Sequence, residues 1–270
     1  MEQAMQNPAG DVPRVAYSVI IPTYNEERRI EATIRTIHSY LEEMQVPFEL
    51  IISDDGSVDG TALVVRRCTD DGVPVRFLPA REHKGKGSTT RRGVLASRGD
   101  HVLITDADLS TPIAELPRLM ERLRLGADIA IGSRALRASR LVVRQPFYRE
   151  WSGRIFNILV RALLHLDIRD TQCGFKLMRG PVARGLFALS TVNGFACDVE
   201  VLALAVKAGL RVEEVPVSWS HCSDSRVRIG RDATAMLFEL ARIAISVRTR
   251  EAPRIPSRVA ADACESLSLL

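Results

Sequence analysis

Short apolar segments alternate with amphipathic segments along the first half of the chain. The segments with the composition of buried strands are 16–24, 48–55, 75–80, 101–108 and 127–134. The segments between them carry apolar residues at helical spacing, for example Ile30, Ile34 and Ile37. Strands that are apolar along their whole length and separated by helices indicate a mostly parallel sheet with helices on both faces. We therefore predict an α/β fold.

The second half of the chain has a different pattern. Residues 135–170 contain an arginine-rich segment and an amphipathic helix. Residues 170–180 and 210–219 have the composition of strands, on either side of a helix that starts near Asp198. The apolar spacing of residues 231–248 predicts a last amphipathic helix. We expect these amphipathic helices to add to the sheet in the C-terminal half.

The charge and cysteine content argue against several classes of protein. The formal net charge is +4, too small by itself to indicate nucleic-acid binding. The 5 cysteines lack C-x-x-C spacing, which argues against a disulfide framework or a zinc site and favours a reducing cytoplasm. We expect no membrane-spanning helix, which needs about 20 apolar residues. The best candidate, 155–168, is interrupted by Asn157, Arg161 and His165.

Arginines are concentrated in one segment of the second half. They are Arg134, Arg137, Arg140, Arg144, Arg149 and Arg154. The segment holds a single acid, Glu150. Such an excess is typical of a site for phosphates or of contact with an anionic membrane surface. A solvated helix face is the alternative that the pattern leaves open.

Polar side chains follow the predicted strands at the points where they end. The letters PTYNE, DDGS, TDAD and GSR stand at the ends of the first, second, fourth and fifth predicted strands. Ligands of such sheets bind beyond the carboxyl ends of the strands. Asp106 and Asp108 stand out, because two neighbouring carboxylates repel each other unless a cation lies between them. A plain turn before Thr111 and Pro112 is the alternative.

These motifs carry a resemblance to a known family. SVIIPTYNE, LIISDDGSVDGT and ITDAD, in this order and spacing, resemble the family 2 glycosyltransferases, which have the GT-A fold and use nucleotide-diphosphate sugars. DADLSTP, GSR, DTQCGFKL and DVE are similar to the branch of dolichyl-phosphate glucosyltransferases and bacterial polyprenyl-phosphate sugar transferases. The resemblance covers about residues 17–245. It implies a Rossmann-like, mostly parallel sheet.

The resemblance implies that Asp106 and Asp108 hold Mg²⁺ or Mn²⁺ against the donor diphosphate. Hard divalent cations prefer carboxylate oxygens together with substrate phosphates. Side chains at i and i+2 of an extended segment project to the same side, so we expect the two carboxylates to face one cation. The cation would also relieve the repulsion between them.

The resemblance further implies a donor-binding set. Its members are Pro22, Tyr24, Glu26, Asp54, Asp55, Lys86, Asp106 and Asp108. Pro22, Tyr24 and Glu26 are expected near the nucleoside, where Tyr24 either stacks on the base or closes the core. The pair Asp54 and Asp55 is expected to accept hydrogen bonds from the base and ribose, or to form an Asx turn. Lys86, Arg91 and Arg92 are unranked candidates for the donor phosphates.

An acceptor-binding set and two catalytic carboxylates are implied in the same way. The acceptor-binding residues are Arg134, Gln172, Lys176 and Arg226. Arg134 resembles the acceptor-side arginine of polyprenyl-phosphate enzymes, and a guanidinium fork suits a phosphate monoester better than an ammonium group does. An ordinary surface arginine is the alternative. Asp198 and Asp170 are the expected catalytic carboxylates. For Asp198, capping of the following helix is the alternative, compatible with catalysis.

We expect one domain between two disordered ends. Residues 1–14 and 249–270 are the predicted disordered ends, and residues 15–248 form the predicted GT-A domain. Within that domain, residues 15–134 are expected to bind the nucleotide sugar and residues 135–248 to bind the acceptor.

The activity implied is an inverting, metal-dependent transfer of a hexose to a polyprenyl or dolichyl monophosphate. UDP-glucose is the favoured donor and GDP-mannose the second. A phosphate monoester has a second pKa of about 6, so it is already a nucleophile at neutral pH. We expect a cytoplasmic enzyme with peripheral contact to the anionic inner face of the membrane, and no nucleic-acid partner.

Two alternatives remain open at this point. The first is a soluble family 2 enzyme acting on a hydroxyl of a saccharide, a glycerate derivative or a natural product. A hydroxyl must lose its proton, so such an enzyme needs a general base. The second alternative is a non-catalytic protein that binds a nucleotide sugar or a membrane surface.

Overall fold

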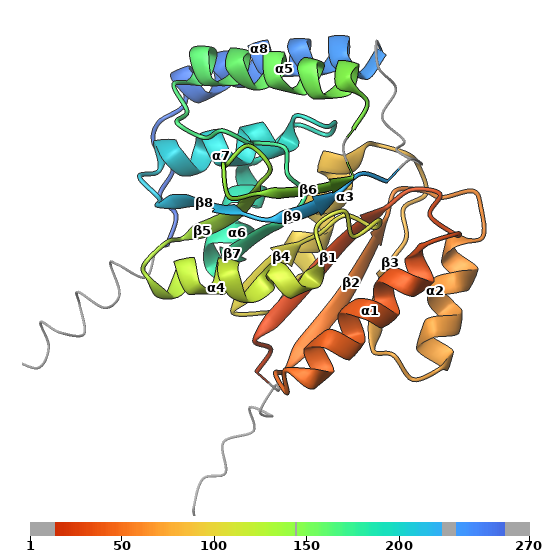
Figure 1. Cartoon of the computed structure of the whole chain (residues 1–270). Coiled ribbons are helices and arrows are strands. Elements are labelled where there is room, and N and C mark those ends of the chain that lie inside the picture. The colour runs from red at the N-terminus through yellow and green to blue at the C-terminus, as the bar shows by residue number, and fades with distance from the viewer. Residues whose placement is uncertain (1–13, 144, 223–230, 257–270) are drawn as a thin grey trace, which may run out of the picture.

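The computed structural model describes residues 14–143, 145–222 and 231–256. The strands of its larger sheet are β1 (Tyr17–Thr23), β2 (Phe48–Asp54), β3 (Val75–Leu78), β4 (His101–Ile104), β5 (Ile129–Ser133), β7 (Lys176–Arg179) and β8 (Val212–Pro216). The first five correspond to the five strands predicted in the first half of the chain. They run toward one edge of the sheet, where the polar motifs follow them (Figure 1).

The sheet has the order β3-β2-β1-β4-β7-β5-β8. All described neighbours in it are parallel except β7, which is antiparallel to both β4 and β5. The mostly parallel sheet is therefore confirmed. A second, two-stranded sheet consists of β6 (Arg140–Val143) and β9 (Ser218–Ser220), which pair in parallel. The sequence did not predict β6, because its residues lie in the arginine-rich segment.

Helices cover both faces of the larger sheet. One face is covered by α1 (Ile30–Glu43), α2 (Thr61–Asp70) and α4 (Leu116–Arg124), the last preceded by a short 3₁₀ helix (Ile113–Glu115). The other face is covered by α3 (Lys86–Ala96), α6 (Gly180–Leu189) and α7 (Cys197–Lys207).

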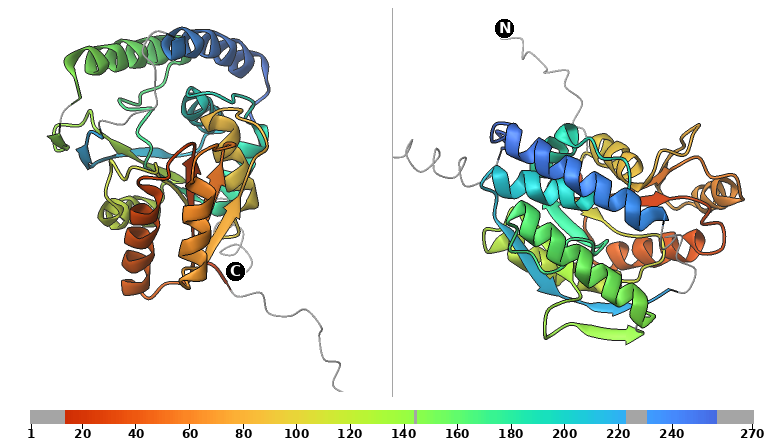
Figure 2. Two further views of the ribbon diagram at one scale, coloured as in Figure 1. Left: turned by 90° about the vertical axis from the view of Figure 1, so that its right-hand side faces the viewer. Right: turned by 90° about the horizontal axis from the view of Figure 1, so that it is seen from above.

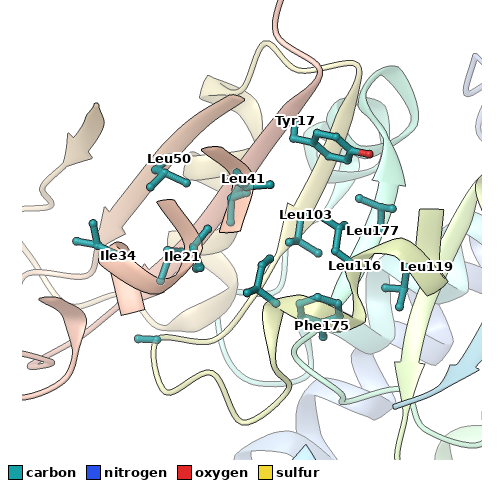
Figure 3. Close-up of a cluster of buried hydrophobic side chains, with 14 of the residues drawn as sticks. Tyr17, Ile21, Ile34, Leu41, Leu50, Leu103, Leu116, Leu119, Phe175 and Leu177 are labelled. Carbon is teal, nitrogen blue, oxygen red and sulfur yellow. The ribbon is translucent and has the colours of Figure 1, made fainter. Parts of the chain in front are cut away.

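Alternate residues of each strand feed the two cores. On the first face, Ile21, Leu103 and Leu177 pack among side chains of α1 and α4 (Figure 3). On the other face, Ile20 and Ile104 pack against α3, α6 and α7. This period of two, with apolar residues at every position, explains the unbroken apolar runs in the sequence.

Helices α5 (Phe147–Leu164) and α8 (Arg231–Thr249) form a further layer (Figure 2). They pack on α7 through a third apolar cluster that includes Phe156, Val160, Val199 and Leu240. The amphipathic helices predicted for the C-terminal half are thus present. Within the part of the chain that the structure describes, no helix combines the length and the apolar composition needed to cross a bilayer.

Two segments differ from the predicted pattern. The strand expected over 170–180 is limited to β7, because residues 170–175 form turns in which Asp170 accepts backbone hydrogen bonds. Helix α6, which starts with proline in its first turn, was not predicted. In the predicted C-terminal tail, Thr249 ends α8 and Ile255 packs against the second core. Residues 1–13 and 257–270 lie outside the described residues.

Candidate active site

The candidate site lies at the edge of the sheet where β1, β2 and β4 end and β7 begins. Because β7 runs antiparallel, its first residue, Lys176, lies beside Ile104, the last residue of β4. The DTQCGFK segment therefore reaches the same edge as the acidic pair that follows β4. Three ion pairs meet there, each joining an expected donor or acceptor residue to an expected carboxylate.

The first ion pair joins Lys86 to Asp106. The Nζ of Lys86 lies 2.7 Å from Oδ1 of Asp106, and the two side chains are 22% and 35% exposed. Burial opposes both charges, but their mutual attraction prevails, so the pKa of Lys86 is raised and that of Asp106 lowered. Both groups are therefore charged at neutral pH. Gly174 is required under this carboxylate, because a Cβ there would lie 1.8 Å from Oδ2 of Asp106.

Asp108 lies in a turn, which differs from the extended geometry expected for the pair. Strand β4 ends at Ile104, and the N–H of Leu109 donates to the carbonyl of Asp106 at 3.2 Å. Oδ1 of Asp108 accepts the N–H of Ser110 at 2.9 Å. The chain turns here because Asp108 caps it, with Leu109 at φ +46°. The turn that the sequence left open therefore exists, and alternation along a strand cannot align the two carboxylates.

The donor set at this turn still suits a hard divalent cation. The hydrogen bonds described above use Oδ1 of Asp106 and Oδ1 of Asp108, so Oδ2 of each carboxylate takes no part in them. Among the described residues, no group of three or more His, Cys, Asp or Glu side chains surrounds a common metal position. Two carboxylates completed by substrate phosphates are the ligands that Mg²⁺ commonly has in nucleotide sites. Asp106 and Asp108 are thus the residues that would hold Mg²⁺ or Mn²⁺.

The second ion pair joins Lys176 to Asp198. The Nζ of Lys176, only 1% exposed, lies 3.0 Å from Oδ1 of Asp198 and also donates to the carbonyl of Cys173. Asp198 lies in the first turn of α7, but Ala196 is the N-cap residue and receives no side-chain cap. The capping alternative is therefore not what the structure shows. Lys176 lies at the site as a buried counter-ion, with no open side toward an acceptor.

The third ion pair joins Arg134 to Asp170. Nε and Nη2 of Arg134 donate to the two carboxylate oxygens at 2.7 and 2.8 Å, and the backbone N–H of Arg134 adds a bond of 2.9 Å. The guanidinium also lies over the ring of Trp219, 5.4 Å from its centroid. Burial opposes ionisation, but the charge of Arg134 outweighs it and lowers the pKa of Asp170. A carboxylate with a lowered pKa is a weak proton acceptor.

The ion pairs of Asp106 and Asp170 make the free energy of unfolding depend on pH. Asp106 and Asp170 have lowered pKa values in the folded chain, so the unfolded chain binds more protons in acid. The stabilisation is complete above the unfolded values, near pH 4, and is lost as the pH falls through the lowered values. We expect the free energy of unfolding to change little between about pH 7 and 5 and to fall below about pH 4.

Urea denaturation at a series of pH values checks this expectation, with Asp170→Asn as the test variant. Removing this titrating group should make the slope below about pH 4 shallower. Asp70→Asn, at an exposed position of α2, is the matched control and should keep the slope of the unaltered chain. An unchanged slope in Asp170→Asn would contradict the assignment.

A loop before α3 is fixed by Asp55. The ring of Tyr24 stacks on His83 with 4.1 Å between ring centroids, and Nδ1 of His83 lies 2.8 Å from Oδ2 of Asp55. The same carboxylate accepts the backbone N–H groups of Lys84 and Gly85 at 2.9 and 2.8 Å. Sequence reasoning missed His83, although the loop 79–85 between a strand and a basic helix start marks its position. Asp55 thus positions the residues that lead directly into Lys86.

The remaining expected donor residues have partners within the chain. Asp54 accepts the N–H of Ser57 at 2.9 Å and the hydroxyl of Thr23 at 3.2 Å, so the Asx-turn interpretation holds for this member of the pair. Glu26 pairs with Arg29. Pro22 lies within β1 and is half-buried. Their contacts with a donor nucleoside stay predictions.

The structure ranks the three basic residues of α3. Arg91 donates to the carbonyls of Ser190 and Val192, and Arg92 donates to those of Asp54 and Leu78. These two arginines therefore tie α3 to its surroundings, while Lys86 contacts the acidic turn. Of the expected acceptor residues, Gln172 follows Asp170 and donates its N–H to that carboxylate at 3.3 Å. Arg226 lies outside the described residues.

Arg29 is a site residue that sequence reasoning missed. Its Nη1 donates to Sγ of Cys222 at 3.2 Å. Burial opposes its charge, but Glu26 and, to a smaller extent, Asp108 raise the pKa of its guanidinium. A signal was present in the sequence, since the basic pair Arg28 and Arg29 lies one residue beyond the PTYNE motif.

An α/β sheet whose carboxyl edge carries an acidic pair and basic side chains is typical of enzymes that bind their ligands beyond the strand ends. The sequence model of the family described as Glycosyl transferase family 2 matches residues 18–187. The chain belongs to this family and is a glycosyltransferase, as the resemblance of its motifs predicted.

Individual relatives agree with this assignment. The chain is 34% identical over 246 residues to a dolichyl-phosphate beta-glucosyltransferase of Dictyostelium discoideum, covering 86% of this chain and 75% of the relative. It is 36% identical over 248 residues to Glycosyltransferase AglD of Haloferax volcanii, covering 91% of this chain but only 39% of that longer protein.

A solved structure confirms the GT-A fold. Glucosyl-3-phosphoglycerate synthase of Mycobacterium tuberculosis, in complex with Mn²⁺, UDP-glucose and glycerol 3-phosphate, superimposes with a TM-score of 0.64 and 21% identity. The match covers 90% of this chain and 82% of that one. At this identity the likeness concerns the fold.

Proposed function

We propose that the enzyme transfers glucose from UDP-glucose to a polyprenyl monophosphate, with inversion at the anomeric carbon and with Mg²⁺ or Mn²⁺ held by Asp106 and Asp108. The names of the relatives support glucose and a dolichyl-phosphate acceptor. The solved neighbour that holds Mn²⁺ and UDP-glucose supports the donor and the metal. GDP-mannose is the second donor that this proposal considers.

The observation that carries the proposal is the ion pairing of both expected catalytic carboxylates. Asp170 is bound by Arg134 through three hydrogen bonds, and Asp198 is paired with the buried Lys176. Neither is free to take a proton from a hydroxyl. A phosphate monoester needs no such base, because its second pKa is about 6. The arrangement therefore favours a phosphate acceptor over a hydroxyl acceptor.

Arg134 is the residue we assign to the acceptor phosphate. Asp170 occupies its Nε and Nη2, which leaves Nη1 and the second N–H of Nη2 to face a ligand. That edge is the guanidinium fork that binds phosphate oxygens in pairs. The ring of Trp219 and the carboxylate of Asp170 fix the plane of the fork. Asp170 is then a positioning residue.

The donor diphosphate belongs on the other side of the same edge. Lys86 lies there on Asp106, and Arg134 is near enough for its charge to lower the pKa of Asp106 as well. A bound divalent cation would neutralise negative charge on the departing nucleoside diphosphate. Lys86 would contribute a second positive charge to the same diphosphate. Positive groups would then stand on both sides of the anomeric carbon, one for each phosphate-bearing substrate.

A transfer assay tests the proposal. Enzyme, Mn²⁺ and labelled UDP-glucose are incubated with a short polyprenyl phosphate, and the expected product is an acid-labile glycolipid whose formation stops on addition of EDTA. Parallel reactions contain GDP-mannose as donor or a free saccharide or glycerate as acceptor. Transfer to a hydroxyl acceptor with none to the lipid phosphate would overturn the proposal.

Replacement of Asp198 separates the two kinds of acceptor. We expect Asp198→Asn to lower kcat by about tenfold or less, because no proton has to be removed from the acceptor. A general base contributes roughly 100-fold to 10,000-fold, so a loss in that range would favour a hydroxyl acceptor. The thermal midpoint of the variant is measured alongside, since Lys176 loses its charged partner. Restoring activity by raising the pH would also indicate a lost base.

The acceptor of this proposal is a membrane lipid, so turnover would take place at a membrane surface. The cytoplasmic side, favoured by the cysteine pattern, stays the predicted location.

A further inference from the structure

The outer sides of α5 and α8 carry large apolar side chains in contact with solvent. We define the α5–α8 apolar face by six of them: Trp151, Ile155, Ile158, Leu237, Phe238 and Ile245. Ile158 is 64% exposed and Phe238 is 75% exposed. Large apolar patches on a protein surface indicate contact with a partner or a membrane.

This face is distinct from the side by which the two helices join the domain. Phe156 and Val160 of α5 and Leu240 and Ile243 of α8 are buried in the third apolar cluster. Ile158 lies on the far side of α5 from that cluster, so the helix is apolar on two sides. A helix side that is apolar is typically buried against a neighbouring structure. In this domain, the side of α5 with Phe156 and Val160 is covered, and the side with Ile158 is exposed.

The outer apolar sides of α5 and α8 form one surface. Both views of Figure 2 show α5 and α8 lying next to each other as the outermost layer, with α7 beneath them. They also contact each other directly. Six apolar side chains from two neighbouring helices therefore form a continuous face rather than isolated contacts.

The described charges of the two helices are unequal. Arg154, Arg161, Arg242 and Arg248 are exposed, and of these Arg154 pairs with Glu150 and Arg161 with Asp167, which leaves Arg242 and Arg248 as the excess. Glu150 is paired with Arg154, and Glu239 points inward, where it accepts the N–H of Ala196 at 3.2 Å. Apolar residues bordered by arginines are typical of helices that lie in the plane of a membrane interface. Each arginine near an anionic lipid surface adds to the attraction.

We propose that the α5–α8 apolar face docks on an anionic lipid bilayer, with both helices lying along the interface. The inference rests on the proposed function for its biological sense, because the proposed acceptor is a lipid. A second copy of this chain is the rival occupant. Self-pairing of this face would bring its arginines together, which is unfavourable.

The position of the face relative to the site agrees with docking. Strand β6 ends at Val143 and α5 begins at Phe147, and β6 pairs with β9 through Leu141 and Trp219. Trp219 is the residue on which Arg134 lies. A short connection therefore joins the proposed phosphate-binding arginine to the docking helix. Docking would thereby connect the membrane-bound helix to Arg134 through β6 and β9.

Vesicle flotation tests the inference without catalysis. The whole chain is mixed with vesicles of phosphatidylcholine alone or with added phosphatidylglycerol, and the bound fraction is measured. We expect binding to the anionic vesicles that weakens with salt. Ile158→Glu combined with Phe238→Glu should lower the partition coefficient about 100-fold or more, because two large apolar side chains are lost from the interface.

A matched control carries the same two changes elsewhere. Val58→Glu combined with Leu63→Glu alters side chains that are 87% and 69% exposed near α2, and it should bind vesicles as the unaltered chain does. Thermal midpoints of both double variants should stay close to that of the unaltered chain, since all four positions face solvent. Equal loss in both variants, or vesicle binding that ignores the charge of the lipid, would overturn the inference.

Two further measurements separate the outcomes. Light scattering after size exclusion detects a dimer; a dimer that dissociates in Ile158→Glu/Phe238→Glu, with no vesicle binding by the unaltered chain, would assign the face to self-association and overturn the inference. Transfer to a water-soluble short-chain phosphate should be unchanged in this variant, while transfer to an acceptor within vesicles falls. If no phosphate acceptor reacts at all, the proposed function fails, yet flotation still decides the docking.

Discussion

Asp106→Asn is expected to lower the rate of sugar transfer by about 1,000-fold. The substitution removes the charge that Asp106 offers to a divalent cation and to Lys86, which lies 2.7 Å away. Metal stabilisation of a leaving group is worth several kcal/mol, and about 4 kcal/mol corresponds to three powers of ten in rate. Initial rates of transfer and Mn²⁺ binding followed by electron paramagnetic resonance measure the two consequences separately.

The binding measurement makes the test specific to the metal. Asp106→Asn should weaken binding of Mn²⁺ in the presence of UDP, whereas a variant that had only lost its fold would also lose its thermal transition. Asp70→Asn, exposed at the end of α2, removes the same charge from a remote surface and should leave both quantities unchanged. Undiminished turnover in Asp106→Asn would remove the basis for a metal at this turn.

Lys176→Met is expected to destabilise the fold by about 3–5 kcal/mol. Lys176 is fully enclosed, and its ammonium is the direct partner of Asp198. Its charge also lowers the pKa of both Asp106 and Asp170. Removal of one partner leaves a buried carboxylate without compensation, which costs much more than loss of a surface ion pair. Urea denaturation followed by circular dichroism gives the change in free energy of unfolding.

A double replacement shows whether the charge or the packing is responsible. Lys176→Met combined with Asp198→Leu replaces the pair by apolar side chains and should regain a large part of the lost stability. Lys84→Met serves as the surface control, because Lys84 is 62% exposed and its Nζ lies 4.0 Å from Oε2 of Glu82, a long surface ion pair. That change should stay within about 0.5 kcal/mol. A double variant as unstable as Lys176→Met alone would show that the pair is not the cause.

Local sequence patterns predicted the elements of the first half better than those of the second. The five strands there are apolar throughout and separated by helices, so periodicity sufficed. The direction of β7 could not be read from its composition, because a buried strand has the same residues whichever way it runs. Strand β6 was missed for a different reason. Its residues pair with those of β9, for example Leu141 with Trp219, 78 positions later in the sequence, and pairing at such a distance leaves no local pattern.

For the site, sequence motifs identified individual residues but not the pairs that those residues form. Motifs identified Asp106, Lys86 and Arg134, and the structure places all three at one edge of the sheet. Their partnerships could not be predicted, because Lys86 and Asp106 are 20 positions apart and Arg134 and Asp170 are 36 apart. Only the strand order brings them together. Asp170, expected to be a catalytic carboxylate, accepts three hydrogen bonds from Arg134, and its role in the reaction stays a prediction.

The reversed strand ties the two halves of the chain into one unit. Strands β4 and β5 both belong to the first half, yet each pairs with β7 rather than with the other. A fragment that stopped at residue 134 would leave β4 and β5 with unpaired backbone groups at the place that β7 occupies in the sheet. During synthesis the nascent sheet would stay split until Arg179 had emerged, and its open edges would be most prone to wrong pairing in that interval. An exchange of either half between enzymes would have to restore the pairing of β7 with both β4 and β5.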